Sequence, residues 1–245
     1  MKRIVCLVFI AFFMFQAYSQ KATVTSPDGL LSVNIFLDNG IPMYAVEYKN
    51  KTMLEKSPLG IITNEGDFSK GLEYISKKEG AVDKKYTQDK IKQSEIHYNA
   101  NSLICTFQNP RGNQVSILFQ VSNNNIAFRY ELPEWGERKA CVIEKEATGF
   151  KFPQSTTTFL SYMMSPMQAF ARTSPSYESG YTNDEQVGKP THENQGYVFP
   201  GLFRINDAGW VLVSETGVNS LYCASHLSDG TQEGLYTVAF PDKRQ

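Results

Sequence analysis

The side chains that could carry chemistry in this sequence gather between residues 174 and 193. Glu178 is a carboxylate set between Tyr177 and Tyr181 in a stretch rich in Ser, Gly and Pro. Such stretches form surface loops, on which binding and catalytic sites are commonly built. The two rings could pack and limit the freedom of the loop, while Gly180 would permit a tight turn. Glu178 is therefore the first candidate for a site residue, and the alternative is a solvated loop glutamate.

Three further carboxylates, Asp184, Glu185 and Glu193, follow in the same region. A pair of carboxyl groups could act as acid and base. No two of these residues have a spacing that requires a shared site, so we expect them to be solvated loop charges.

A mutarotase would use a histidine and a glutamate as acid and base, so the three histidines are candidates for that alternative activity. His97 falls in a predicted strand at 94–98, His192 falls in a loop, and His226 follows a predicted strand that begins at Tyr222. Nothing in the sequence pairs any of them with a specific glutamate. No CxxC or HExxH spacing indicates a zinc site.

The elements that would position these residues are β-strands, because the dominant hydrophobic period is two. Apolar residues alternate with polar ones in stretches centred on 31–37, 44–48, 115–121 and 126–132. Turn sequences separate the strands, and they are Pro27-Asp28-Gly29, Asp38-Asn39-Gly40, Asn109-Pro110-Arg111-Gly112 and Ser122-Asn123-Asn124. Short turns join antiparallel neighbours. The sequence therefore predicts an all-β fold, one large antiparallel β-sandwich of roughly ten or more strands.

Some segments fit this pattern less well. Residues 160–172 come closest to a helical period, but Pro166 interrupts it and an irregular segment is expected. Residues 70–92 are charged and poor in apolar side chains, which indicates a solvated excursion or a ragged sheet edge. Cys105 lies in an apolar run and is expected in the core. Trp210 lies in another apolar run and is also expected in the core.

Residues 1–19 have the pattern of a secretory signal peptide. Lys2 and Arg3 form a basic start, residues 4–15 are an apolar run, and small residues precede Gln20. The apolar run is short for a membrane span. We therefore expect cleavage between Ser19 and Gln20, export to the periplasm or the medium, and a mature chain of residues 20–245.

The charge balance of the mature chain excludes some classes of partner. Without Lys2 and Arg3, 22 basic residues stand against 25 acidic ones, a net charge of −3. A chain without a basic field is a poor ligand for nucleic acid or for anionic lipid. We expect neither nucleic acid nor a membrane as a partner.

Several motifs, taken in order, resemble the N-terminal domain of glycoside hydrolase family 97, a family of bacterial α-glucosidases and α-galactosidases. They are Thr25-Ser26-Pro27-Asp28-Gly29, Lys56-Ser57-Pro58-Leu59-Gly60, Ala127-Phe128-Arg129-Tyr130-Glu131-Leu132-Pro133, Tyr177-Glu178 with Tyr181, and the stretches beginning at Tyr197, Gly209, Tyr222 and Tyr236. The resemblance implies an antiparallel β-super-sandwich related to the galactose-mutarotase fold. It also implies that this domain packs against a (β/α)₈ barrel that carries the catalytic carboxylates.

The resemblance assigns Glu178 a role as one ligand of a calcium ion (Ca2+) shared with that barrel. Calcium takes several hard oxygen ligands in irregular geometry, so a single loop carboxylate can complete such a site. A barrel needs about 250 residues of its own. We therefore expect residues 20–245 to be this domain without its catalytic barrel, incomplete at its C-terminus and inactive alone, with carbohydrate as substrate of the full-length enzyme.

Two alternatives to this interpretation stay open. The first is a free-standing carbohydrate-binding module, for which Trp135, beside Glu134 and Glu137, could stack on a sugar, although packing under a loop explains it as well. The second is a structural partner that docks onto a separately encoded barrel through an apolar patch.

Overall fold

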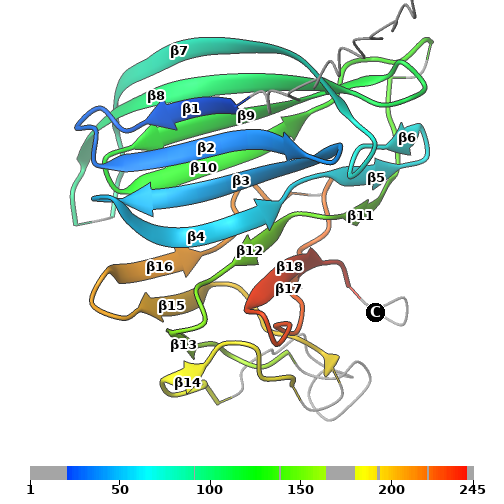
Figure 1. Ribbon diagram of the computed structural model, residues 1–245. Helices are drawn as coiled ribbons and strands as arrows, with labels where there is room; N and C mark the ends of the chain where they lie inside the picture. The colour runs from blue at the N-terminus through cyan, green and yellow to red at the C-terminus, as the bar shows by residue number, and fades with distance from the viewer. Residues whose placement is uncertain are drawn as a thin grey trace, which may run out of the picture.

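The computed structural model describes residues 21–90, 92–137, 139–163, 180–191, 194–219 and 221–241. These residues form β-strands joined by turns and loops, with no α-helix among them (Figure 1). Within these ranges there is accordingly no helix that could cross a membrane. The predicted all-β, antiparallel class is confirmed.

The first half of the chain builds a sandwich of two four-stranded sheets. One sheet has the order β1-β2-β3-β4, with β1 (Lys21–Thr25), β2 (Leu31–Asp38), β3 (Ile41–Tyr48) and β4 (Lys51–Pro58). The other has the order β10-β9-β8-β7, with β7 (Glu73–Thr87), β8 (Glu95–Gln108), β9 (Gln114–Ser122) and β10 (Asn125–Glu131). The sheets face each other (Figure 1).

Alternating burial along these strands confirms the strands predicted from the period of two. Val33 and Ile35 of β2 point into the core and are fully buried, as is Cys105 of β8. The two-residue turn between β2 and β3 has Asn39 at a φ of 51° and Gly40 at 77°. Positive φ at both positions is the geometry of a tight type I′ hairpin.

The second half of the chain builds a second sandwich from shorter strands. One sheet has the order β12-β18-β17, with β12 (Gly149–Lys151), β17 (His226–Leu227) and β18 (Leu235–Ala239). The other has the order β14-β13-β15-β16, with β13 (Thr156–Phe159), β14 (Glu185–Gln186), β15 (Gly201–Ile205) and β16 (Gly209–Val213). A small sheet of order β11-β5-β6 lies beside the first sandwich, with β5 (Ile61–Thr63), β6 (Gly66–Asp67) and β11 (Ile143–Glu146).

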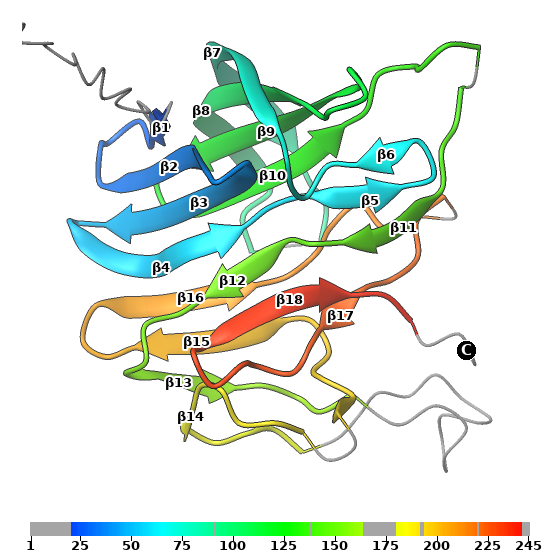
Figure 2. The same ribbon diagram turned by 45° about the vertical axis from the view of Figure 1, so that its right-hand side comes forward.

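The two sandwiches are continuous through β4 and β12, which lie side by side in Figure 2. The buried Tyr44 of β3 packs its ring 5.8 Å from that of Phe128 in the first sandwich, and its hydroxyl donates to the carbonyl of Gly149, at 2.9 Å. The amide of Lys151 donates to Ser57 Oγ, also at 2.9 Å. One layer therefore runs through both halves, which is the architecture of a super-sandwich.

The expectation for residues 70–92 was a solvated excursion or a ragged sheet edge, and the structure agrees with an exposed edge. The charged stretch at 70–92 contains β7, a regular strand of 15 residues whose side chains are nearly all exposed. It lies at the edge of its sheet and pairs only with β8. Charged side chains on an exposed edge hinder pairing with other chains. Because neither face of this strand is buried, its sequence lacks the alternation that marks the other strands.

The core of the second sandwich depends on stacked aromatic rings, which generates a prediction. Phe203 of β15 is fully buried, with its ring 3.8 Å from that of Phe152 and 5.2 Å from that of Tyr236. Truncation of a buried phenylalanine to alanine costs about 3–5 kcal/mol of stability. We expect Phe203→Ala to lower the free energy of unfolding in urea by that amount.

The matched control is Leu212→Ala on the neighbouring strand, where the side chain is 64 % exposed. It should change the free energy of unfolding by about 0.5 kcal/mol or less. Equal losses in the two variants would contradict the assigned core.

Candidate functional site

The described residues show how the ends of the segment containing Glu178 are held. Glu178 itself, like Tyr177, lies outside the described residues. On one side the chain leaves β13 through Ser161 and Tyr162, and on the other it returns through Tyr181. Ser161 forms an antiparallel bridge with Tyr181, and Tyr162 forms one with Tyr197. The two ends of this segment are therefore fixed next to each other on the second sandwich.

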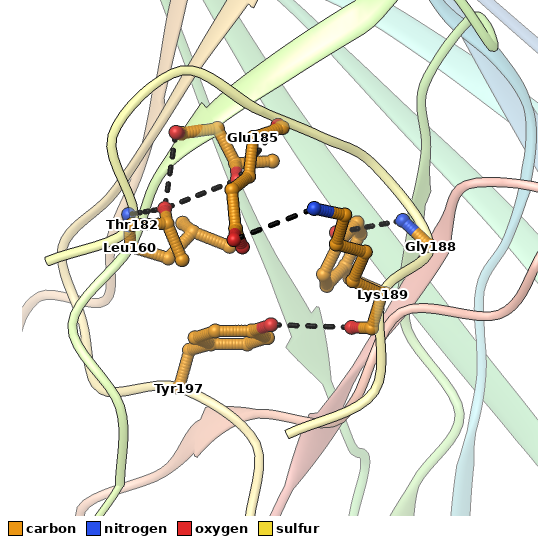
Figure 3. Close-up of polar contacts among 8 residues, drawn as sticks. Leu160, Thr182, Glu185, Gly188, Lys189 and Tyr197 are labelled. Atoms are coloured by element: carbon orange, nitrogen blue, oxygen red, sulfur yellow. Dashed lines mark hydrogen bonds and ion pairs between the residues drawn. The ribbon is translucent and has the colours of Figure 1, made fainter. Parts of the chain in front are cut away.

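A buried threonine hydroxyl joins the two ends (Figure 3). Thr182 Oγ1 accepts the amide of Leu160 at 2.7 Å and donates to the carbonyl of Thr158 at 3.0 Å. The amide of Thr182 in turn donates to the carbonyl of Leu160 at 2.8 Å. Thr182 is 3 % exposed, so water cannot replace these partners. This junction fixes the direction in which the chain enters and leaves the sheet.

Aromatic rings support the same junction from the core. The ring of the buried Tyr197 lies 5.5 Å from that of Tyr162 and 6.1 Å from that of Tyr236. Its hydroxyl donates to the carbonyl of Lys189 at 3.2 Å, and the hydroxyl of Tyr236 accepts the amide of Gly188 at 3.2 Å. Burial raises the pKa of Tyr236 to about 12 and that of Tyr197 further still. Both phenols stay protonated at neutral pH and act as fixed hydrogen-bonding groups.

The carboxylates near this junction form ion pairs. Asp184 accepts hydrogen bonds from Arg204 and from Thr157 Oγ1, the latter at 2.5 Å, so it joins the loop to β13 and β15. Glu185 Oε1 lies 3.4 Å from Lys189 Nζ (Figure 3). Both side chains remain partly exposed to solvent, as expected of loop charges, but each also has a cationic partner, and Glu193 lies outside the described residues. The partner of Asp184 could not be foreseen from sequence, because Arg204 lies 20 residues away.

Acid, base and metal chemistry would require His, Cys, Asp or Glu side chains that lie together among the described residues. Among them, no group of three or more His, Cys, Asp or Glu side chains is placed to hold a metal ion. His97 bonds to Asp83 at 2.8 Å on the exposed strand β7, and His192 lies outside the described residues. Burial lowers the pKa of His226, and the nearby charge of Glu215 opposes that shift.

Glu215 is held by the residue that precedes β17, a contact that the sequence did not indicate. Its two carboxylate oxygens accept the amide of Ser225 at 3.0 and 3.2 Å, and Oε2 also accepts Ser225 Oγ at 2.6 Å. These bonds close the segment between β16 and β17 into a loop, so the prediction of a strand beginning at Tyr222 is wrong. Glu215 therefore has a positioning contact with Ser225, and its charge also acts on the nearby His226.

The two tryptophans lie in contrasting environments. Trp135 stacks on Phe68 at 5.3 Å, which supports loop packing over sugar stacking. Trp210 was expected in the core, and this is wrong, because its side chain is 54 % exposed. Its strand β16 turns Val211 and Val213 inward and Trp210 outward, where the ring contacts Phe159 and the guanidinium of Arg204. Because the residues of this run are all apolar, the sequence does not show which of them face the core.

The Thr182 junction generates a second prediction. Thr182→Val keeps the shape of the side chain but leaves the buried amide of Leu160 without its acceptor. An unsatisfied buried donor costs about 1–3 kcal/mol. We expect that loss in urea unfolding, whereas the control Thr182→Ser, which keeps the hydroxyl, should lose clearly less. A loss in Thr182→Ser that equals or exceeds the loss in Thr182→Val would contradict the assignment of the hydroxyl as the main stabilising group of the junction.

Glu146 generates a prediction about pH. Burial raises its pKa above the ordinary value, and Glu215 raises it further, while a hydrogen bond with Thr148 opposes the shift. When the pKa of a carboxyl group is higher in the folded state than in the unfolded state, the group favours the folded state most at low pH. This stabilisation is lost as the pH rises from the pKa of the unfolded state through the pKa of the folded state.

Glu146→Gln should therefore raise the melting temperature at about pH 7 and by clearly less at about pH 4, where the carboxyl is mostly protonated in both states. Thermal unfolding at both pH values measures this. Glu144→Gln, on the exposed side of the same strand, is the control and should show no such difference. A gain for Glu146→Gln that is equal at both pH values would contradict the burial of a charge.

Comparison with known proteins agrees with this architecture. The sequence profile described as "Glycosyl-hydrolase 97 N-terminal" matches residues 24–242. The crystal structure of a β-arabinopyranosidase is 47 % identical, with a TM-score of 0.88, and the match covers 91 % of this chain and 36 % of that one. A glycoside hydrolase family 97 enzyme of Pseudoalteromonas sp. strain K8, solved in complex with panose, is 22 % identical to this chain, with a TM-score of 0.72. The match covers 89 % of this chain and 32 % of that one, and it shows that the two share a fold.

A curated relative is the probable retaining α-galactosidase of Streptomyces bingchenggensis (strain BCW-1). It is 25 % identical over 194 residues, which make up 79 % of this chain and 28 % of the relative. The chain thus spans about a third of the length of the proteins it matches. From the profile match over nearly all described residues and the super-sandwich fold, the chain belongs to the N-terminal domain family of glycosyl hydrolase 97.

Proposed function

We propose that this chain is the N-terminal domain of an exported glycosidase that removes β-arabinopyranosyl or α-galactosyl groups from oligosaccharides. In this proposal the catalytic barrel follows the domain in the complete gene product. The 47 % identity to a β-arabinopyranosidase across 91 % of the chain carries the proposal. Export rests on the signal-peptide pattern of residues 1–19.

The β-arabinopyranosidase and the probable α-galactosidase are named for sugars that are chemically similar. β-L-Arabinopyranose and α-D-galactopyranose have the same arrangement of ring hydroxyls and differ by one exocyclic hydroxymethyl group. A site that hydrogen-bonds these hydroxyls would recognise both sugars, and the space around C5 would decide between them. The higher identity favours the arabinopyranoside as the better substrate.

The contacts of the described carboxylates support a catalytic site outside this domain. Glycoside hydrolysis commonly uses two carboxyl groups on either side of the scissile bond. Asp184 and Glu185 are engaged in ion pairs, and Glu215 is bound to Ser225. These side chains serve the fold of the domain, so the acid and the base or nucleophile come from the barrel in this proposal.

Glu178 is proposed as one ligand of a calcium ion shared with the barrel. The described residues offer no set of ligands of their own, and in this proposal the barrel supplies oxygen ligands that complete the site with Glu178. What supports the proposal is the junction of Ser161, Tyr181 and Thr182, which fixes both ends of the segment that carries Glu178. A bound calcium ion would supply a positive charge beside the substrate.

The test uses the complete gene product with 4-nitrophenyl β-L-arabinopyranoside and α-D-galactopyranoside as substrates. We expect turnover of both, with the higher kcat/KM for the arabinopyranoside, and none by residues 20–245 alone. Removal of calcium with a chelator should abolish most of the activity. Glu178→Gln should lower calcium affinity and kcat/KM together, by about 10-fold or more.

Glu144→Gln, an exposed carboxylate on β11, is the matched control and should change neither calcium affinity nor activity. Unchanged calcium affinity in Glu178→Gln would refute the metal assignment. Turnover by residues 20–245 alone would refute the proposal that the catalytic residues lie in the barrel and not in this domain. Sugar binding by that chain, lost in Trp210→Ala, would favour the alternative of a free-standing carbohydrate-binding module.

A further inference from the structure

The loop between β16 and β17 holds apolar side chains in solvent. Leu221 is 82 % exposed, Tyr222 is 60 % exposed and Val218 is 48 % exposed. Exposed apolar area of this kind is unfavourable in water. We define this stretch, residues 214–219 and 221–225, as the apolar loop.

Hydrogen bonds within the apolar loop hold it in this form. Glu215 closes its base by accepting the amide and hydroxyl of Ser225. At its tip, Asn219 accepts the amide of Leu221 on its side-chain oxygen at 2.9 Å and the amide of Tyr222 on its carbonyl at 3.1 Å. These contacts give the loop a defined shape with its apolar side chains directed outward.

The composition of the apolar loop fits a protein interface. Between Thr216 and Ser225 the sequence has no charged residue. The cores of protein interfaces are depleted in charge and enriched in tyrosine. The one carboxylate of the loop, Glu215, is bound within it.

The position of the apolar loop indicates which partner covers it. It ends at Ser225, directly before β17, and His226 of β17 pairs with Ala239 of β18. The base of the loop therefore lies next to Phe240, where the described chain runs toward the C-terminus. In Figure 2 the orange segment between β16 and β17 lies on the same side of the molecule as the end of β18. A domain that follows in the same polypeptide would begin beside this loop.

We infer that the apolar loop is the docking surface for the catalytic domain of the same polypeptide, with Leu221 and Tyr222 as its central contacts. This inference rests on the proposed function, in which such a domain follows. It is consistent with the match covering only 36 % of the β-arabinopyranosidase chain. The polar contacts of Glu215 and Asn219 would hold the loop in its bound shape before docking, which reduces the entropy lost on binding.

The test compares Leu221→Ser/Tyr222→Ser with the matched control Leu212→Ser, which removes an exposed leucine from the outer face of β16. Each variant is made in the complete gene product and in residues 20–245. We expect the double variant to lower the melting temperature of the complete protein by about 4 °C or more, because buried interdomain contacts are lost. Its effect on residues 20–245 and the effect of the control should be smaller than about 1 °C.

An unchanged melting temperature of the complete protein, or an equal fall in both lengths of chain, would overturn the inference. So would a dimer of residues 20–245 in sedimentation that the double variant dissociates, because the partner would then be a second copy. The activity of the wild-type complete protein is measured separately. If that protein cleaves neither glycoside, the proposed substrates fail, while the melting temperatures still decide the docking surface.

Discussion

The ring of Tyr236 is the contact on which the second half of this domain depends. It lies 5.2 Å from the ring of Phe203 in the facing sheet and 6.1 Å from that of Tyr197. Its hydroxyl accepts the amide of Gly188, so the same side chain packs the core and holds the 180–191 segment. Short strands bury little area each, and a shared aromatic core allows them to form one cooperative unit. The positions of Thr182 and of the ends of the Glu178 segment follow from this core.

The polar groups of the second sandwich serve mainly to hold loops. Asp184 joins its loop to two strands through Arg204 and Thr157, and Glu215 closes the apolar loop through Ser225. Both carboxylates are within reach of solvent, yet both are satisfied by neighbours in the chain. A domain whose carboxylates are used in this way is suited to positioning loops for a catalytic partner, and the proposed function assigns it that task.

The sequence predicted the first sandwich better than the second. Strands with one buried face show the period of two, and β2, β3, β9 and β10 were predicted from it. β7 is exposed on both faces and therefore carries no such signal. Trp210 was placed in the core because its neighbours Val211 and Val213 are apolar, although alternate residues of that strand face opposite sides. The site contacts of Thr182, Asp184 and Glu215 join residues 10 to 27 positions apart, and no local pattern marks such pairs.

Hydrogen–deuterium exchange on the complete gene product and on residues 20–245 tests the central claim most directly, namely that this domain presents a preformed surface to a catalytic domain. The account predicts that the amides of the apolar loop, including that of Tyr222, exchange more slowly in the complete protein. The amides of the exposed edge strand β7 should exchange at the same rate in both. Equal exchange of the apolar loop in the two proteins, with protection gained elsewhere on the domain, would contradict the account.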